Sequence, residues 1–120
     1  TSLDRLGLED RIILQTGNKL MNESGGLSGK PLQIKANNII KHIHNNDRKI
    51  ILIGVGGIDS PKAAWERICS GASLIQVYTG WIYKGPLLVP EIAKGILKQL
   101  EFYKLSNVKE AIGSGLKWQD

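Results

Sequence analysis

Two glycine-rich segments, one strand and one helix apart, hold residues whose types and spacing could bind a phosphate. Gly56 and Gly57 follow one apolar run, and the tripeptide Tyr78-Thr79-Gly80 follows the next. Glycine has no Cβ, so backbone N–H groups at such positions can approach phosphate oxygens closely. In parallel α/β barrels, the loops after the seventh and eighth strands commonly bind a phosphate, together with a short extra helix. The sequence therefore predicts a phosphorylated cofactor held by these two loops.

The predicted helices that position these loops show apolar periodicity and typical first residues. They begin at Pro31, Pro61, Pro90 and Asn107. Proline is well tolerated in a first helical turn because the N–H that it lacks would be unpaired there. Ser60 is expected to cap the second helix and Gly71 to end it. Asn107 and Glu110 are spaced as a capping box for the last one.

The predicted strands span residues 49–55 and 73–77, with a possible further strand at 12–14. Residues 50–53 are apolar without interruption, which is typical of a strand covered on both faces in a parallel sheet. Strands that alternate with helices of about 12 residues indicate βαβ units. The sequence therefore predicts an α/β fold.

The number of predicted strands is too small for a complete domain. Two or three parallel strands would leave open edges and uncovered apolar faces, and a full barrel of this type needs about 250 residues. We expect the 120 residues to be the C-terminal part of a larger domain, and the absence of an initial methionine suggests a processed or truncated product. The alternative is a small open α/β domain that completes itself by forming oligomers.

Composition and the remaining motifs exclude several classes of protein. A net charge of +5 without a basic run argues against nucleic acid binding. No apolar stretch approaches the roughly 20 residues of a membrane-spanning helix. Cys69 is a lone cysteine, for which a buried, unreactive position is expected. His42 and His44 lie two apart on a helix and lack a nearby cluster of ligands, so no metal site is expected.

Two glycine motifs resemble nucleotide-binding signatures only in part. Residues 54–59 lack the third glycine of the dinucleotide fingerprint, and residues 25–30 are followed by Pro31 where a P-loop needs serine or threonine. A tight turn between a strand and a helix is the structural alternative for Gly56 and Gly57. The second glycine-bearing loop, one unit later, favours phosphate binding for both loops.

Three glycine-containing motifs occur in order along the chain: Gly-Gly-Leu-Ser-Gly-Lys-Pro-Leu at 25–32, Ile-Gly-Val-Gly-Gly-Ile at 53–58, and Gln-Val-Tyr-Thr-Gly at 76–80 followed by Lys-Gly-Pro at 84–86. Together they resemble the dihydroorotate dehydrogenase family, and in particular its quinone-dependent class 2 branch. Residues 1–5 resemble the family's Asn-Thr-Thr-Leu-Asp-Arg segment without its asparagine, and residues 110–113 resemble its C-terminal end. The soluble class 1 enzymes carry relatives of the first two motifs, so it is the third that favours class 2.

The resemblance implies that residues 1–120 are the C-terminal part of a (β/α)8 TIM barrel that binds FMN. Such an enzyme oxidises dihydroorotate to orotate in pyrimidine biosynthesis, and quinone then reoxidises the flavin. By motif position, FMN is expected to contact Gly29, Gly57, Tyr78 and Thr79, while Gly56 and Gly80 shape the loops. Thr1 is expected to contact the substrate.

The resemblance also implies parts that the chain does not contain. The family's serine base, its flavin-contacting lysine and its other substrate asparagines are expected upstream of residue 1, so no catalytic residue is expected here. An amphipathic N-terminal segment would place the whole protein peripherally on the bacterial inner membrane, on its cytoplasmic face, or on the mitochondrial inner membrane of a eukaryote. The alternatives are a class 1 enzyme, another FMN- or sugar-phosphate-binding barrel, and a phosphate-binding module without catalysis.

Overall fold

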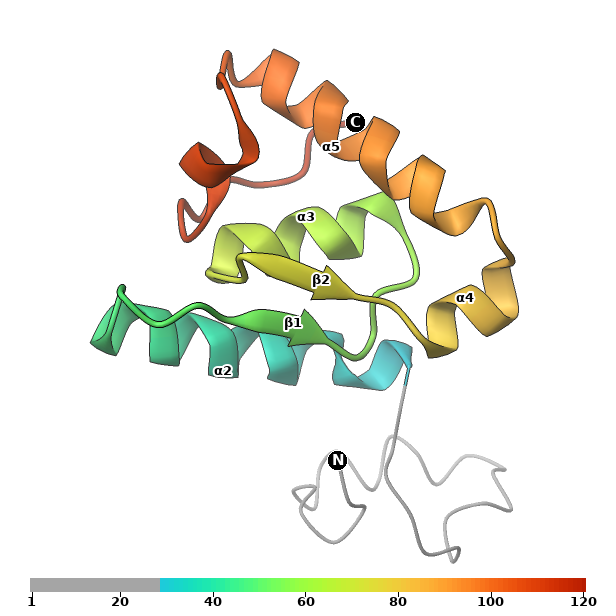
Figure 1. Ribbon diagram of the computed structural model, residues 1–120, viewed down its shortest axis with the longest axis horizontal. Helices are drawn as coiled ribbons and strands as arrows, with labels where there is room; N and C mark the ends of the chain where they lie inside the picture. Colours follow the sequence, from blue (N-terminus) through green and yellow to red (C-terminus); the bar gives the residue numbers. More distant parts are fainter. Residues whose placement is uncertain (1–28) are drawn as a thin grey trace, which may run out of the picture.

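The structure is a computed structural model that describes residues 29–120 (Figure 1). The predicted strand at 12–14, Thr1 and residues 25–28 of the first motif lie outside the described residues. The elements in chain order are η3 (Lys30–Leu32), α2 (Gln33–Asn46), β1 (Ile53–Val55), α3 (Pro61–Ser70), β2 (Leu74–Gln76), α4 (Thr79–Lys84), α5 (Leu88–Phe102) and η4 (Val108–Ala111). Strands and helices alternate along this order, so the described residues form part of an α/β fold.

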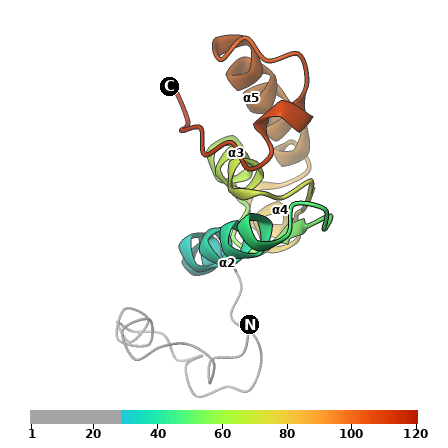
Figure 2. The ribbon, with the colours of Figure 1, turned by 90° about the vertical axis from the view of Figure 1, so that its left-hand side faces the viewer.

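The two strands pair in parallel, with Ile53 opposite Leu74 and Val55 opposite Gln76. The connection from β1 to β2 runs through α3, which makes the predicted βαβ unit. Helix α3 packs against both α2 and α5, and the three helices are stacked one above another in Figure 2. The parallel arrangement brings the loops that follow both strands to the same end of the sheet, beside α4 (Figure 1).

The helix ends confirm the local sequence signals. The Ser60 hydroxyl accepts a hydrogen bond from the N–H of Ala63, and Gly71 ends α3 at a φ of 133°. The Asn107 side chain caps η4 by accepting from the N–H of Lys109, whereas Glu110 accepts from the N–H of Ser106 rather than from that of Asn107, so only the Asn107 half of the predicted capping box is confirmed. Because these caps depend only on residues close in sequence, they could be predicted without knowledge of the fold.

The strands differ from the prediction in length and in coverage. Strand β1 begins at Ile53 rather than at residue 49, because a ladder extends only where a partner strand lies alongside. The sequence predicts strands covered on both faces, whereas Ile53 is 56% exposed, Val55 52% and Leu74 58%. Within the described residues these side chains occupy one uncovered face, while Gly54 is buried against α3.

Helix α5 begins earlier than predicted, at Leu88 rather than at Pro90. Pro90 therefore lies within the first turn of the helix. A proline is accepted there because the N–H groups of the first turn have no partner inside the helix.

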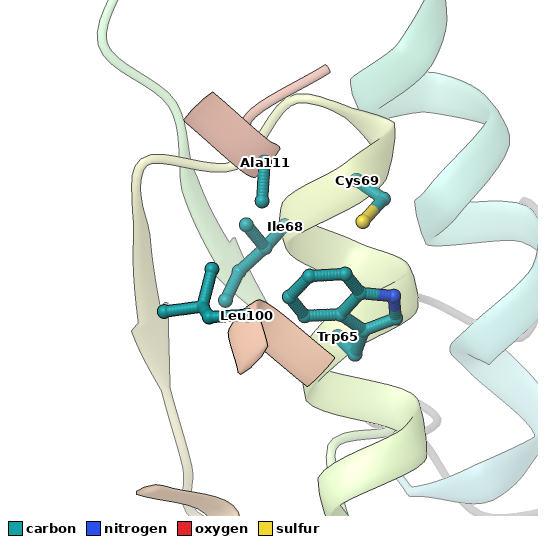
Figure 3. Close-up of a cluster of buried hydrophobic side chains, with 5 residues drawn as sticks. All are labelled: Trp65, Ile68, Cys69, Leu100 and Ala111. Carbon is teal, nitrogen blue, oxygen red and sulfur yellow. The ribbon is translucent and has the colours of Figure 1, made fainter. Parts of the chain in front are cut away.

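The main hydrophobic cluster lies between α3, α5 and η4. Figure 3 shows Trp65, Ile68 and Cys69 from α3, with Leu100 from α5 and Ala111 from η4. The Trp65 ring is fully buried and stacks on Tyr103 with ring centroids 6.1 Å apart. This cluster holds α3 against α5 and so fixes the helix that follows the first glycine loop.

A second cluster lies beneath the glycine loops and consists of Ile58, Ala64, Leu88 and Ile92. Ile58 is part of the loop after β1, and Leu88 and Ile92 belong to α5. The loop after β1 is thus anchored in the core by an apolar side chain directly after Gly57. Such anchoring restricts where the neighbouring N–H groups can point.

The C-terminal segment closes over the end of α3. The N–H groups of Gly113 and Gly115 donate to the carbonyls of Ile68 and Cys69, at 3.1 and 3.0 Å. The ring of His44 fills the space between Gly71 and Gly113, and a Cβ at either glycine would overlap it. The carbonyl end of α3 therefore has partners from a segment distant in sequence.

Candidate phosphate-binding site

Three segments that are far apart in sequence meet at the end of the sheet. Gly29 lies beside Thr79, so that a Cβ at Gly29 would stand 3.7 Å from the Thr79 Cγ2. A Cβ at Gly57 would stand 2.9 Å from the carbonyl oxygen of Gly29. The loop that precedes η3, the loop after β1 and the start of α4 therefore form one cluster, which we call the glycine cluster (Gly29, Gly56, Gly57, Thr79 and Gly80).

Gly80 brings the loops after the two strands into backbone contact. It is buried, and a Cβ there would overlap the carbonyl oxygen of Ile58 and stand 3.0 Å from the Cα of Asp59. This approach requires a residue without a side chain. The predicted role of Gly80 in shaping the loop has this contact as its physical basis.

Gly56 and Gly57 both adopt a positive φ, at 90° and 73°. Side-chain-bearing residues rarely adopt this conformation, so the pair is restricted to glycine by backbone geometry. At Gly57 the space for a Cβ is also taken by Gln33, whose Cγ would be 2.8 Å away. Glycine at position 57 is thus required by the packing of loop against loop as well as by the turn.

Two side chains from neighbouring helices fix the carbonyl groups of this turn. Arg67 of α3 donates from Nη2 to the carbonyl of Gly56 at 2.7 Å and from Nη1 to the carbonyl of Val55 at 3.0 Å. Gln33 of α2 donates to the carbonyl of Gly57 at 2.7 Å and to Asp59 Oδ1 at 3.0 Å. The peptide bond is trans, so each N–H that follows points away from its fixed carbonyl.

Several N–H groups of this region have no partner among the described residues. Within residues 29–120, no hydrogen bond uses the N–H of Gly57, Thr79 or Gly80, or the hydroxyl of Thr79. Buried backbone N–H groups nearly always have a partner. An acceptor with several oxygens, such as a phosphate, fits this set of donors.

Tyr78 lies directly before the start of α4, and its side chain is not packed against the described residues. Its ring is 71% exposed, and its carbonyl accepts from the N–H groups of Trp81 and Ile82 at the start of α4. The structure therefore places five of the predicted site residues in the glycine cluster, with Tyr78 directly beside it. Thr1, the predicted substrate contact, lies outside the described residues.

Sequence reasoning missed Arg67 and Gln33. Arg67 occupies a helix face that also carries Ala63, Ala64 and Ile68, all of them buried. A cation at core-facing spacing is the signal that could have identified it. Gln33 gives no comparable signal, because its partners lie on another segment of the chain.

A cavity of about 310 Å³ adjoins the glycine cluster. Its lining includes Lys30, Lys62 and Lys84, together with the carboxylates of Asp59 and Glu66. The three lysines outnumber the two acidic residues, so the lining carries a small excess of positive charge. A larger cavity of about 700 Å³ lies between α2, α3 and residues 113–118, away from all predicted site residues.

The described residues contain no feature of a metal centre or of a membrane-spanning helix. No group of three or more potential metal ligands occurs within residues 29–120. Cys69 is buried, as expected, and burial raises the pKa of its thiol. No described helix is long and apolar enough to cross a bilayer.

The parallel strands and connecting helices define the class of protein as α/β. The family model described as dihydroorotate dehydrogenase matches residues 5–100, so the chain belongs to the dihydroorotate dehydrogenase family. This confirms the family recognised from the three sequence motifs.

The most informative relatives are cyanobacterial proteins named dihydroorotate dehydrogenase (quinone). The one from Prochlorococcus marinus is 53% identical over 120 residues, which make up 99% of this chain and 31% of the relative. The one from Nostoc punctiforme is 48% identical over 118 residues, again 31% of its length. These names confirm the resemblance to the quinone-dependent branch. The chain spans about a third of the length of these relatives.

A solved structure supports the fold of the described part. The ligand-free dihydroorotate dehydrogenase of Eimeria tenella superimposes with a TM-score of 0.75 at 32% identity, over 83% of this chain and 28% of that one. The same enzyme in complex with ferulenol gives a TM-score of 0.76. The arrangement of helices around the two strands is therefore shared with a member of the family.

Proposed function

We propose that this chain is the C-terminal part of a quinone-dependent dihydroorotate dehydrogenase and that it holds the phosphate of FMN. The observation that carries the proposal is the glycine cluster, in which three separate segments meet and in which the N–H groups of Gly57, Thr79 and Gly80 and the hydroxyl of Thr79 have no partner among residues 29–120. Membership of the dihydroorotate dehydrogenase family, which is generally flavin-dependent, supports FMN as the phosphorylated ligand.

The proposed complete domain is a (β/α)8 barrel, of which residues 1–120 form the C-terminal portion. The exposed apolar side chains of Ile53, Val55 and Leu74 support this. In a barrel, inward-facing side chains pack in layers against those of the other strands. The uncovered face of β1 and β2 would then belong to the interior of the barrel.

In this proposal the chain's own residues bind and orient the cofactor. Gly29, Gly57, Tyr78 and Thr79 would contact FMN, chiefly through backbone N–H groups to its phosphate, and the Thr79 hydroxyl would add a further hydrogen bond. Gly56 and Gly80 would shape the loops so that the segments approach each other closely enough. When bound, FMN would supply the redox chemistry, and the protein would position it.

The substrate and acceptor would be dihydroorotate, which yields orotate, and a quinone. Thr1 would contact the substrate. The general base and the remaining substrate contacts would come from the part of the relatives' length that this chain does not cover. The whole protein would act in pyrimidine biosynthesis, peripherally on a membrane that contains quinone.

The experiment uses the full-length protein in which this chain occurs. Flavin released by acid from the purified protein identifies the cofactor, and oxidation of dihydroorotate is followed with a soluble quinone analogue. We expect FMN close to one per protein and turnover with the quinone. A matched assay measures the rate with a soluble acceptor that is not a quinone. Comparison of the two rates distinguishes a quinone-dependent enzyme from a class 1 enzyme.

Three results would overturn the proposal in different ways. Bound FMN without oxidation of dihydroorotate would favour another FMN-binding barrel. Turnover that is faster with the soluble acceptor would favour class 1. Binding of phosphate but no flavin would favour a phosphate-binding module without catalysis.

A further inference from the structure

Arg67 is the most deeply buried charged side chain near the glycine cluster. Only 1% of its surface is exposed, although it belongs to a residue type that is rarely buried without a charged partner. Its hydrogen bonds go to the carbonyls of Val55 and Gly56 and to the side-chain oxygen of Asn37. All three acceptors are neutral.

No carboxylate in the described part of the chain accepts a hydrogen bond from Arg67. A buried guanidinium with neutral partners retains most of its desolvation cost. Burial accordingly lowers the pKa of Arg67. An anion close to this position would offset that cost.

One peptide group connects Arg67 to the glycine cluster. The carbonyl of Gly56 and the N–H of Gly57 belong to one trans peptide, so fixing the carbonyl on Arg67 aims the N–H the opposite way. A cation bound to the carbonyl also polarises the peptide and makes its N–H a stronger donor. The charge of Arg67 therefore acts on the far side of a single peptide group.

We propose that Arg67 is the positioning residue of the phosphate site: it orients the Gly56–Gly57 peptide and supplies the positive charge behind it. The inference rests on the proposed FMN site. It predicts that Arg67 determines the preference for phosphorylated flavin over riboflavin, which has the same ring system and no phosphate. Arg67 would not contact the phosphate itself.

The test is titration of the apo form of the full-length protein with FMN and, separately, with riboflavin. Quenching of flavin fluorescence measures the binding. Arg67→Met keeps most of the side-chain volume and removes the charge. We expect it to weaken FMN binding by about ten- to a hundredfold, the range for loss of a charge-assisted hydrogen bond, and to change riboflavin binding by less than about threefold. Arg67→Lys keeps the charge and is expected to recover most of the FMN affinity.

The matched control is Arg48→Met, which removes the same charge from an exposed position and is expected to leave both affinities unchanged. Thermal melting of each apo form shows whether it folds. If Arg67→Met does not melt cooperatively, Arg67→Gln carries the same test, since it keeps a donor and removes the charge.

The outcomes separate this inference from the proposed function. Equal loss of FMN and riboflavin binding in the Met or Gln variant would mean that Arg67 only supports the fold. Unchanged preference for FMN would also overturn the inference while leaving the phosphate site intact. A wild-type protein that binds FMN no better than riboflavin would instead overturn the proposed phosphate site.

Discussion

Replacing Gly80 with alanine tests whether contact between the two strand-end loops is needed for cofactor binding. The change adds one methyl group, and Gly80 does not have a positive φ, so backbone strain is not involved. The added Cβ would overlap the carbonyl oxygen of Ile58, which is a backbone atom and cannot rotate away. The loop after β1 and the start of α4 must therefore move apart.

The size of the effect follows from this overlap. Forcing an extra methyl group into a closely packed site typically costs about 1–3 kcal/mol. If the movement is confined to the two loops, that cost falls on the ligand-bound state, and FMN affinity is expected to drop by about five- to 150-fold. The hydrophobic cluster around Trp65 contains neither Gly80 nor Ile58, so the packing of α3 against α5 should be unaffected by the substitution.

The assay is FMN titration of the apo full-length protein, together with its thermal melt. Gly85→Ala is the matched control at the other end of α4, where a Cβ would meet nothing within 4 Å and only the φ of 84° is unfavourable. It is expected to lower stability by about 1–3 kcal/mol, because its φ of 84° and ψ of −174° lie in a region that only glycine adopts readily, and to leave FMN affinity nearly unchanged. If Gly80→Ala binds FMN as tightly as the wild type, the loop contact does not support the cofactor site.

Three further predictions concern single side chains. Thr79→Val keeps a methyl group beside Gly29 and removes the hydroxyl, so FMN affinity is expected to fall about ten- to a hundredfold at an unchanged melting temperature. Equal FMN affinity of the variant and the wild type would show that the hydroxyl does not bind the cofactor. Trp65→Ala empties the centre of the main cluster and should lower the free energy of unfolding by about 3–5 kcal/mol, measured from the denaturant midpoint; a loss below about 1 kcal/mol would contradict the described packing. Burial raises the pKa of Cys69, so the stability that its neutral thiol contributes is present below the unfolded-state pKa and is lost as pH rises through the folded-state pKa. The difference in melting temperature between wild type and Cys69→Ala should therefore shrink as the pH rises above about 8.5, the ordinary pKa of a cysteine thiol, and a constant difference would argue against a buried thiol.

Local signals in the sequence predicted the element boundaries that depend on neighbouring residues. Ser60, Pro61 and Gly71 set the two ends of α3 through contacts within one or two turns. Gly56, Gly57 and Gly80 lie together, because parallel strands place the loops after them at one end of the sheet. Backbone topology was sufficient for that inference, whereas Gly29, which follows neither strand, was predicted only from the family resemblance.

Features that depend on distant partners could not be predicted in the same way. The length of β1 is set by the strand beside it rather than by its own run of isoleucines. The role of Arg67 depends on carbonyls that approach it only after α3 has packed beside β1. The sequence shows Arg67 at core-facing spacing in its helix, but it does not show which carbonyl groups Arg67 meets there.

The closure of α3 by the C-terminal segment has a consequence for the order of folding. The carbonyls of Ile68 and Cys69 receive the N–H groups of Gly113 and Gly115, which lie far along the chain after β2 and α5. Pairing residues so distant in sequence requires closure of a long loop, which slows their association. The end of α3 would therefore acquire its last partners late, after α5 has docked. The exchange of the Gly113 and Gly115 amide hydrogens with solvent would then report opening of the whole α3–α5 unit rather than fraying of a terminus.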